Sequence, residues 1–184
     1  KAMAERVWIL SNAYAANTEA KFSAVRYGNV AGSRGSVIPL FAERVRAGLP
    51  VSVTDVRMTR FWLTLQDGVQ FVARAVDSLS DEDHRGEVLI PVLKAFSVHD
   101  LAAAVGGGKV PIELGSGIRP GEKLHELLLS ADETRAYACY RGPGDILRLT
   151  SQPPGDPLAV VAELSSEKAE RMTLQELAAG VEPF

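Results

Sequence analysis

The chain has 184 residues, 46% of them hydrophobic, which is enough for a globular protein with one sizeable core. A net charge of −3 without any run of basic residues argues against a nucleic-acid-binding surface. Cys139 is the only cysteine, so an internal disulfide and a thiolate metal cluster are excluded, as is usual in a reducing compartment. The three histidines lie far apart in sequence, and we expect no metal site.

The sequence contains no apolar run near the roughly 18 to 20 residues that a membrane-spanning helix needs. No positively charged segment precedes an apolar one at the start of the chain, so the pattern of a signal peptide is missing. We therefore expect a soluble, cytoplasmic protein.

The first residues have the pattern of a helix that is already in progress. Apolar residues at helical spacing predict a helix over residues 1–17, and an apolar and aromatic run predicts a strand over 22–27. Neither a capping residue nor an initiator methionine stands ahead of this helix. We interpret Lys1 as a point inside a helix of a longer protein.

A glycine-rich loop, residues 28–36, follows the predicted strand and leads into a helix predicted over 37–46. Free backbone N–H groups at a helix start attract phosphate, glycines allow close approach, and Arg34 could add a guanidinium group. The alternative is an ordinary turn between a strand and a helix, and the loop alone does not decide between the two.

The middle and the tail of the chain alternate between short strands and helices, which favours an α/β or mixed arrangement. Spacing and turn residues predict strands over 51–55, 58–65, 86–91, 110–114 and 146–150, and helices over 67–79, 97–106 and from 173 onward. A second glycine-rich loop, 115–126, carries Arg119 and is expected to run into a helix. Two such loops favour a phosphate-containing ligand, although Arg119 could instead cap a turn or form a salt bridge.

Four motifs, in order, resemble the C-terminal half of the nucleotide-sugar 4,6-dehydratases of the extended short-chain dehydrogenase/reductase superfamily. The resemblance is strongest to the UDP-N-acetylglucosamine 4,6-dehydratases of surface-polysaccharide and flagellin-sugar pathways, and it runs from Lys1 almost to Phe184. The motifs are Arg26-Tyr-Gly-Asn-Val, Gly32-Ser-Arg-Gly-Ser-Val, Asp55-Val-Arg-Met-Thr-Arg-Phe-Trp and Gly117-Ile-Arg-Pro-Gly-Glu-Lys-Leu-His-Glu.

This resemblance implies an α/β fold that is the C-terminal part of an extended short-chain dehydrogenase. Residues 1–35 would be the last helix and strand of a doubly wound Rossmann domain, whose N-terminal part is absent. Residues 36–184 would form a smaller mixed substrate-binding region, with some segments returning to the Rossmann domain. No Gly-x-x-Gly-x-x-Gly turn is present, so NADP would be held mainly by the absent N-terminal half.

The resemblance also implies roles for residues near the cofactor. Lys1 resembles the lysine of the family's Tyr-x-x-x-Lys pair, which binds the nicotinamide ribose and lowers the pKa of the catalytic tyrosine. Tyr27 resembles a residue close to the nicotinamide amide. The alternatives are that Lys1 is a frayed terminal lysine and that Tyr27 belongs to the core.

Further residues resemble the family's substrate contacts. Two arginines would clamp the diphosphate of a UDP-sugar, an acidic residue would accept from the ribose hydroxyls, and a loop and a helix start would meet the diphosphate or the uridine. Arg34 and Arg57 are expected only as rim charges. The implied substrate contacts are Asn29, Ser36, Val37, Arg60, Arg119 and Glu122.

The implied function is substrate binding in an enzyme that removes water from UDP-N-acetylglucosamine by transient NADP-dependent oxidation at C4. This chain alone is expected to be inactive, with the N-terminal Rossmann half as its partner and a homo-oligomer as the assembly. Two alternatives stay open: half of a UDP-sugar 4-epimerase, and a non-catalytic nucleotide-sugar-binding domain or remnant. The segment Met58-Thr-Arg-Phe-Trp favours the dehydratase.

Overall fold

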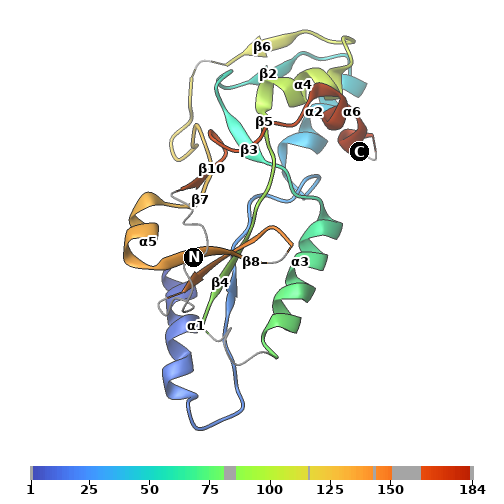
Figure 1. Cartoon of the computed structure of the whole chain (residues 1–184). Helices are drawn as coiled ribbons and strands as arrows, with labels where there is room; N and C mark the ends of the chain where they lie inside the picture. The colour runs from blue at the N-terminus through green and yellow to red at the C-terminus, as the bar shows by residue number, and fades with distance from the viewer. Residues whose placement is uncertain (1, 81–85, 116, 143, 151–162, 183–184) are drawn as a thin grey trace. The chain divides into compact units, whose positions relative to one another are not determined.

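A computed structural model of the chain describes residues 2–80, 86–115, 117–142, 144–150 and 163–182 (Figure 1). Its helices and strands alternate, which confirms the expected α/β class. In chain order they are α1 (Ala2–Tyr14), β1 (Ala24–Val25), α2 (Val37–Arg46), β2 (Val51–Val53), β3 (Thr59–Phe61), α3 (Leu65–Ser78), β4 (Val88–Pro91), β5 (Ala95–Ser97), α4 (Val98–Gly106), β6 (Ile112–Leu114), β7 (Leu127–Leu129), α5 (Ala131–Ala136), β8 (Ala138–Gly142), β9 (Ile146–Thr150), β10 (Leu164–Ser165) and α6 (Leu174–Val181).

The chain divides into two compact units, each assembled from three separate stretches of sequence. Unit 1 consists of residues 1–27, 66–92 and 128–164, and unit 2 consists of residues 28–65, 93–127 and 165–184. The expected division at residues 35 and 36, with some later segments returning to the first domain, stays a prediction.

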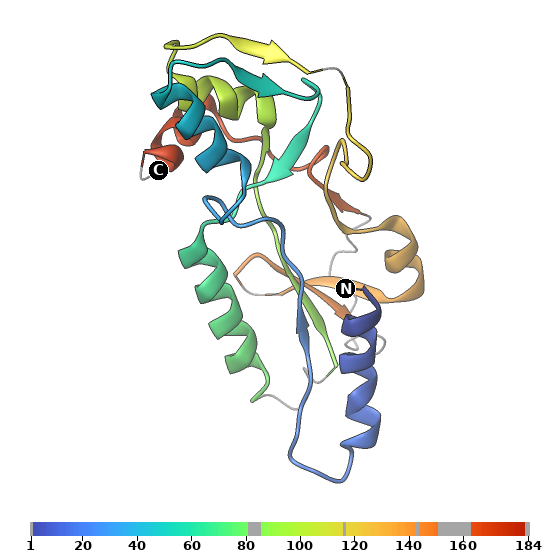
Figure 2. The ribbon, with the colours of Figure 1, turned by 180° about the vertical axis from the view of Figure 1, so that it is seen from behind.

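Unit 1 is built on a mixed four-stranded sheet in the order β1-β4-β9-β8. Strands β1 and β4 run parallel, whereas β9 is antiparallel to both β4 and β8. The helices α1 and α3 flank these strands in both views (Figures 1 and 2). Phe71 and Ala75 of α3 pack against Leu89 and Ile146 of the sheet, so this contact forms one core of the unit.

Unit 2 gathers α2, α4 and α6 beside two short two-stranded sheets (Figure 2). Strands β2 and β6 pair in parallel, and β3 and β5 pair antiparallel with Arg60 opposite Phe96. Phe41 of α2, Val53 of β2 and Leu177 of α6 meet in one buried cluster. Because all three helices contribute to this cluster, the strands that they cover are held in fixed positions.

Helix ends that carry a local signal lie where the sequence predicts them. Helix α2 begins at Val37, and Gly48 follows its end with a φ of 66°. The hydroxyl of Ser97 accepts from the backbone N–H of Asp100 at the start of α4. A reciprocal capping box opens α6, as the sequence predicts.

Two expectations about local structure are wrong. The second glycine loop runs into strand β7 and not into a helix, because its carbonyl groups are used elsewhere: that of Leu124 accepts from the backbone N–H of Thr59 at 3.0 Å. In α2 the helical spacing predicts that Leu40 shares the buried face with Phe41, but Leu40 is 52% exposed, and the buried residues of the helix are Ile38, Phe41 and Ala42.

None of the helices in the described ranges is both long and apolar enough to span a bilayer.

Candidate functional site

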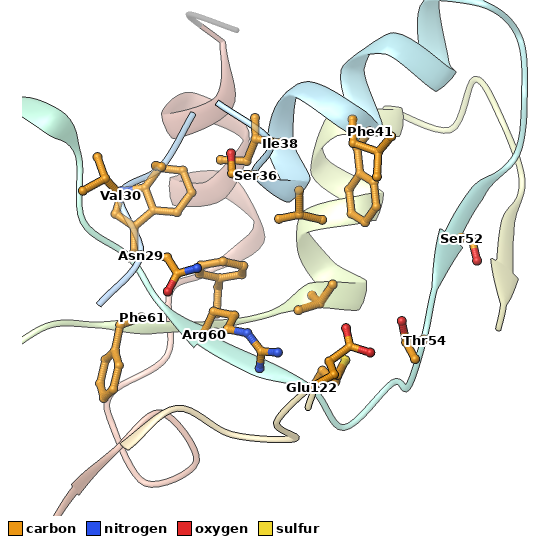
Figure 3. A pocket seen from close by; sticks show the side chains of 18 of the residues that line it. Asn29, Val30, Ser36, Ile38, Phe41, Ser52, Thr54, Arg60, Phe61 and Glu122 are labelled. Carbon is orange, nitrogen blue, oxygen red and sulfur yellow. The ribbon is translucent and has the colours of Figure 1, made fainter. Parts of the chain in front are cut away.

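A pocket of about 320 Å³ lies within unit 2, and every residue that lines it belongs to that unit. Its walls come from the start of α2, from β2, β3 and β5, and from the second glycine loop. Figure 3 shows the side chains of Asn29, Arg60 and Glu122 projecting into the same space. The polar lining residues are Asn29, Ser36, Ser52, Thr54, Arg60, Arg119 and Glu122.

One wall is the N-terminus of α2. The turn that precedes it places Gly32 and Gly35 at φ values of 71° and 77°, a conformation that favours glycine. Ser36 is the N-cap residue in extended conformation, yet its side chain makes no cap hydrogen bond. Its buried hydroxyl has no partner among the described residues. A buried hydroxyl without a partner costs about 1–3 kcal/mol, so a ligand that bonds to it would recover this cost.

Arg60 is held in a defined position by backbone carbonyl groups. Its Nη1 donates to the carbonyl oxygens of Thr59 at 2.7 Å and Leu124 at 3.2 Å, and its Nη2 donates to that of Lys123 at 2.8 Å. Its Nε lies 3.5 Å from the carboxylate of Glu126. These contacts leave one Nη2 hydrogen that can donate to an anionic ligand in the pocket.

Arg119 and Glu122 occupy opposite ends of one tight turn. The backbone N–H of Glu122 donates to the carbonyl oxygen of Arg119 at 2.9 Å, and the Glu122 carboxylate accepts from the backbone N–H of Arg119 at 3.2 Å. In the part of the chain that the structure describes, no carboxylate pairs with the Arg119 guanidinium. The interpretation of Arg119 as a salt-bridge residue therefore has no support here.

The remaining wall is apolar and partly aromatic. Phe41, Trp62 and Phe96 line the pocket, and the rings of Trp62 and Phe96 meet edge to face with centroids 5.7 Å apart. Flat apolar surface beside two arginines fits a ligand that has both a planar ring and a charged group.

The structure brings together six of the predicted site residues and leaves others elsewhere. Asn29, Ser36, Val37, Arg60, Arg119 and Glu122 all line this one pocket.

The predicted cofactor residues are not part of this pocket. Lys1 lies outside the described residues. Tyr27 belongs to unit 1, where its ring packs edge to face on Phe71 with centroids 6.4 Å apart. Since Tyr27 is 41% exposed, it is not a simple core residue and its ring can still be reached.

The two expected rim charges do not line the pocket. Arg57 instead closes on Asp55, whose carboxylate accepts from the Arg57 backbone N–H at 2.8 Å and from Nη2 at 2.7 Å. These hydrogen bonds from Arg57 lower the pKa of Asp55 to about 2. Arg34 is exposed.

Sequence reasoning missed the residues that support Arg60. The motifs quoted above include Thr59, His125 and Glu126. Ser166 lies outside these motifs, and its neighbours in sequence give no signal of its role. Ser52 and Thr54 were also missed, although their position on and just after a short strand beside a glycine loop was a usable signal.

Among the described residues, no group of three or more histidine, cysteine, aspartate or glutamate side chains could hold a metal ion.

A family model described as "Polysaccharide biosynthesis protein" matches residues 1–142 of the chain. Among curated proteins, a UDP-N-acetylglucosamine 4,6-dehydratase (inverting) from Campylobacter jejuni is 39% identical over 135 residues, which cover 73% of this chain and 39% of that protein. A UDP-glucose 4-epimerase from Rickettsia massiliae is 35% identical over 154 residues, which cover 79% of this chain and 43% of that protein. The chain therefore spans about two fifths of the length of these relatives.

The solved structure of Pen from Bacillus thuringiensis has a similar fold, with a TM-score of 0.79 and 28% sequence identity. The match covers 98% of this chain and 55% of that one, so both units have counterparts in the longer protein. The resemblance found in the four motifs is confirmed by these comparisons.

Proposed function

We propose that this chain, which belongs to the polysaccharide biosynthesis protein family, is the UDP-sugar-binding part of a nucleotide-sugar 4,6-dehydratase acting on UDP-N-acetylglucosamine. One observation carries the proposal. Six residues expected as substrate contacts, spread over 94 positions from Asn29 to Glu122, line a single pocket.

The chemistry of the pocket supports a nucleoside diphosphate. Arg60, Arg119 and the start of α2 provide positive charge and N–H donors for the diphosphate. The carboxylate of Glu122 would accept from the ribose hydroxyls. The aromatic wall offers a surface on which the planar uracil ring can pack.

In the reaction, NADP would supply a reversible hydride acceptor for C4 of the sugar. Of this chain's residues, Lys1 would hold the nicotinamide ribose and keep a neighbouring tyrosine acidic, and Tyr27 would lie beside the nicotinamide amide. The pocket residues would bind the nucleotide and orient the sugar for the reaction, in which a position error of about 1 Å can cost about a hundredfold in rate. The chain thus contributes positioning, and its partner, the N-terminal Rossmann half, contributes most of the cofactor site.

The wider setting follows from the same proposal. The enzyme would act in the cytoplasm on the way to a surface polysaccharide or glycan, as a homo-oligomer. Residues 1–35 would complete the Rossmann domain of the enzyme, and residues 36–184 would mainly bind the substrate.

UDP binding to the chain itself tests the proposal. Titration calorimetry should show that UDP binds and that Arg119→Ala and Arg60→Lys each weaken it by about tenfold or more, since a charge-assisted hydrogen bond from a guanidinium group to the diphosphate is lost. Arg57→Ala is the matched control, because Arg57 is exposed, binds Asp55 and does not line the pocket. Absence of UDP binding, or equal effects of all three variants, would refute the proposal.

A second candidate function is half of a UDP-sugar 4-epimerase, which the Rickettsia relative favours. The two are distinguished with a protein in which this chain is joined to an N-terminal Rossmann half. Given UDP-N-acetylglucosamine, a dehydratase yields a product lighter by one water in mass spectrometry. An epimerase yields a product of unchanged mass and altered stereochemistry.

A further inference from the structure

A buried polar cluster lies next to Arg60, and none of its residues lines the pocket. It consists of Thr59, His125 and Ser166, and Thr59 and Ser166 are almost completely buried. The Thr59 Oγ1 lies 2.8 Å from the Nδ1 of His125 and 2.7 Å from the Oγ of Ser166. The cluster therefore joins three stretches of sequence: β3, the second glycine loop and the segment after β10.

Ser166 ties the glycine loop to β3. Its hydroxyl donates to the carbonyl oxygen of Thr59 at 3.0 Å and accepts from the backbone N–H of Glu126 at 2.8 Å. Its own backbone N–H donates to the carbonyl oxygen of Glu126 at 2.8 Å. The Ser166 side chain is thus one link between the strand and the loop, beside the hydrogen bond from the Thr59 backbone N–H to the Leu124 carbonyl oxygen.

The same two segments provide the contacts of the Arg60 guanidinium. The Thr59 carbonyl oxygen accepts from both Ser166 and Arg60, and the loop supplies the carbonyl groups of Lys123 and Leu124. If the loop shifts away from β3, these two carbonyl groups move with it. The direction of the guanidinium then changes, although Arg60 itself is intact.

We propose that Ser166, through its hydrogen bonds to Thr59 and Glu126, is a positioning residue that sets the direction of the Arg60 guanidinium toward the anionic part of the ligand. This inference rests on the proposed function, because it takes a nucleoside diphosphate as the ligand. It gives the C-terminal segment of the chain a part in ligand binding, although Ser166 does not line the pocket.

The number of hydroxyl hydrogens in the cluster determines which ring nitrogen of His125 carries a hydrogen. The Ser166 hydroxyl has a single hydrogen, which its bond to the Thr59 carbonyl uses. The contact between the two hydroxyls then requires Thr59 to donate to Ser166. The contact between Thr59 and His125 can be kept only if Nδ1 of His125 carries a hydrogen and donates it.

The chain offers a closely matched control for a test of Ser166. The neighbouring Ser165 is also buried, but its Oγ has no partner among the described residues. Ser166→Ala and Ser165→Ala therefore remove the same group at adjacent buried positions, and only the first breaks the cluster.

Calorimetric titration of the chain with UDP and with uridine is the test. We expect Ser166→Ala to weaken UDP binding by about tenfold and uridine binding by much less, since uridine lacks the diphosphate that Arg60 would hold. Ser165→Ala should bind both ligands as the unmodified chain does. Combining Ser166→Ala with Arg60→Lys should add little to the loss that Arg60→Lys causes alone, because both act on one contact.

Equal losses for UDP and uridine would show that Ser166 is merely structural and would overturn the inference. Unchanged UDP binding in Ser166→Ala would overturn it as well. If the unmodified chain does not bind UDP at all, the proposed function fails. The positioning role is then decided by ¹H–¹⁵N spectra: the Arg60 Nε–H resonance should shift in Ser166→Ala and not in Ser165→Ala, and an unchanged resonance would refute it.

Discussion

Gly180 shows how a single missing side chain shapes the pocket wall. A Cβ atom at this position in α6 would lie 2.6 Å from Cζ2 of Trp62, closer than van der Waals contact allows. The indole that lies against Gly180 also lines the pocket and packs edge to face on Phe96. The lack of a side chain at Gly180 therefore lets Trp62 occupy its observed place.

Replacing Gly180 with alanine sets two effects against each other. Alanine is about 1 kcal/mol better than glycine inside a helix, but an overpacked contact costs about 1–3 kcal/mol. Because the ring of Trp62 has a rigid neighbour in Phe96, we expect the clash to win. Urea denaturation should show Gly180→Ala to be less stable than the unmodified chain by about 1 kcal/mol.

Gly106→Ala is the control for this prediction, because Gly106 also lies in a helix and the nearest atom to its added Cβ is 4.0 Å away. This variant should be as stable as the unmodified chain or slightly more so. A Gly180→Ala chain that is equally stable would mean that the indole moves aside at no cost.

At the scale of elements, the sequence predicts those whose signals are local. Helices α2, α4 and α6 begin at a serine or threonine and were predicted to within a residue or two. Strands β5, β7, β8 and β10 were missed, and so was helix α5, although a capping box opens it. Strands β5, β7 and β10 pair with distant segments, so nothing within them indicates their pairing, whereas β8 pairs with the neighbouring β9.

The residues of the site also fall into two groups: those that stand in a motif and those that only the fold brings together. Asn29, Arg60 and Glu122 could be predicted because the motifs that contain them resemble those of the nucleotide-sugar 4,6-dehydratases. The link between Thr59 and Ser166 spans 107 positions and depends only on how the chain folds. No spacing rule applies to such a pair.

The buried face of a helix also depends on its surroundings. In α3 the valines at helical spacing predicted the helix correctly, yet Val69 and Val76 are each 61% exposed. The residues of α3 that pack against the sheet of unit 1 are instead Phe71 and Ala75. The periodicity identified the helix but not the side that packs on the sheet.

The start of α6 carries a titratable stabilising contact. Glu176 accepts from Lys94 at 2.8 Å and from the backbone N–H of Thr173 at 2.7 Å. These hydrogen bonds, first that from Lys94, lower the pKa of Glu176 from 4.5 to about 2. A carboxylate with a lowered pKa stabilises the folded state above its ordinary pKa, and the contribution disappears as pH falls through the lowered value.

We therefore expect the difference in unfolding free energy between the unmodified chain and Glu176→Gln to be constant above about pH 5 and to shrink as pH falls toward about 2. Denaturant unfolding at a series of pH values measures it. Glu170→Gln is the control, since Glu170 is the more exposed partner of Lys94 and caps no helix. A difference between the unmodified chain and Glu176→Gln that does not change between pH 5 and pH 2 would contradict the role of the Glu176 carboxylate.

At the scale of the whole molecule, neither unit is a continuous piece of sequence. The chain passes between the units after residues 27, 65, 92, 127 and 164. Each unit can be completed only when its last stretch has been added, and for unit 2 that stretch contains Ser166 and α6. Each unit is therefore discontinuous in sequence.

Unit 1 contains a buried ion pair between Glu87 and Arg148, which links strands of its sheet. The carboxylate of Glu87 accepts hydrogen bonds from the Tyr140 hydroxyl and the Arg148 guanidinium, and all three residues are buried. Burial and the neighbouring Glu87 charge raise the pKa of Tyr140, so its hydroxyl keeps its proton. The three side chains connect the start of β4 to β8 and β9.

Removing the charge of Glu87 should be severe, because a buried guanidinium group without a counter-charge remains. Breaking one partner of a buried ion pair costs about 3–5 kcal/mol, a large part of the roughly 5–15 kcal/mol that stabilises a domain. We expect Glu87→Gln to lower the unfolding free energy by about 3 kcal/mol or more in urea denaturation. Tyr140→Phe should cost about 1.5–3 kcal/mol, because one hydrogen bond to a charged group is lost while the ion pair remains. Asp132→Asn, which removes an exposed ion pair with Arg135, should stay within about 0.5 kcal/mol of the unmodified chain. If Glu87→Gln costs no more than Asp132→Asn, water reaches Arg148 and the pair does not hold the sheet of unit 1 together.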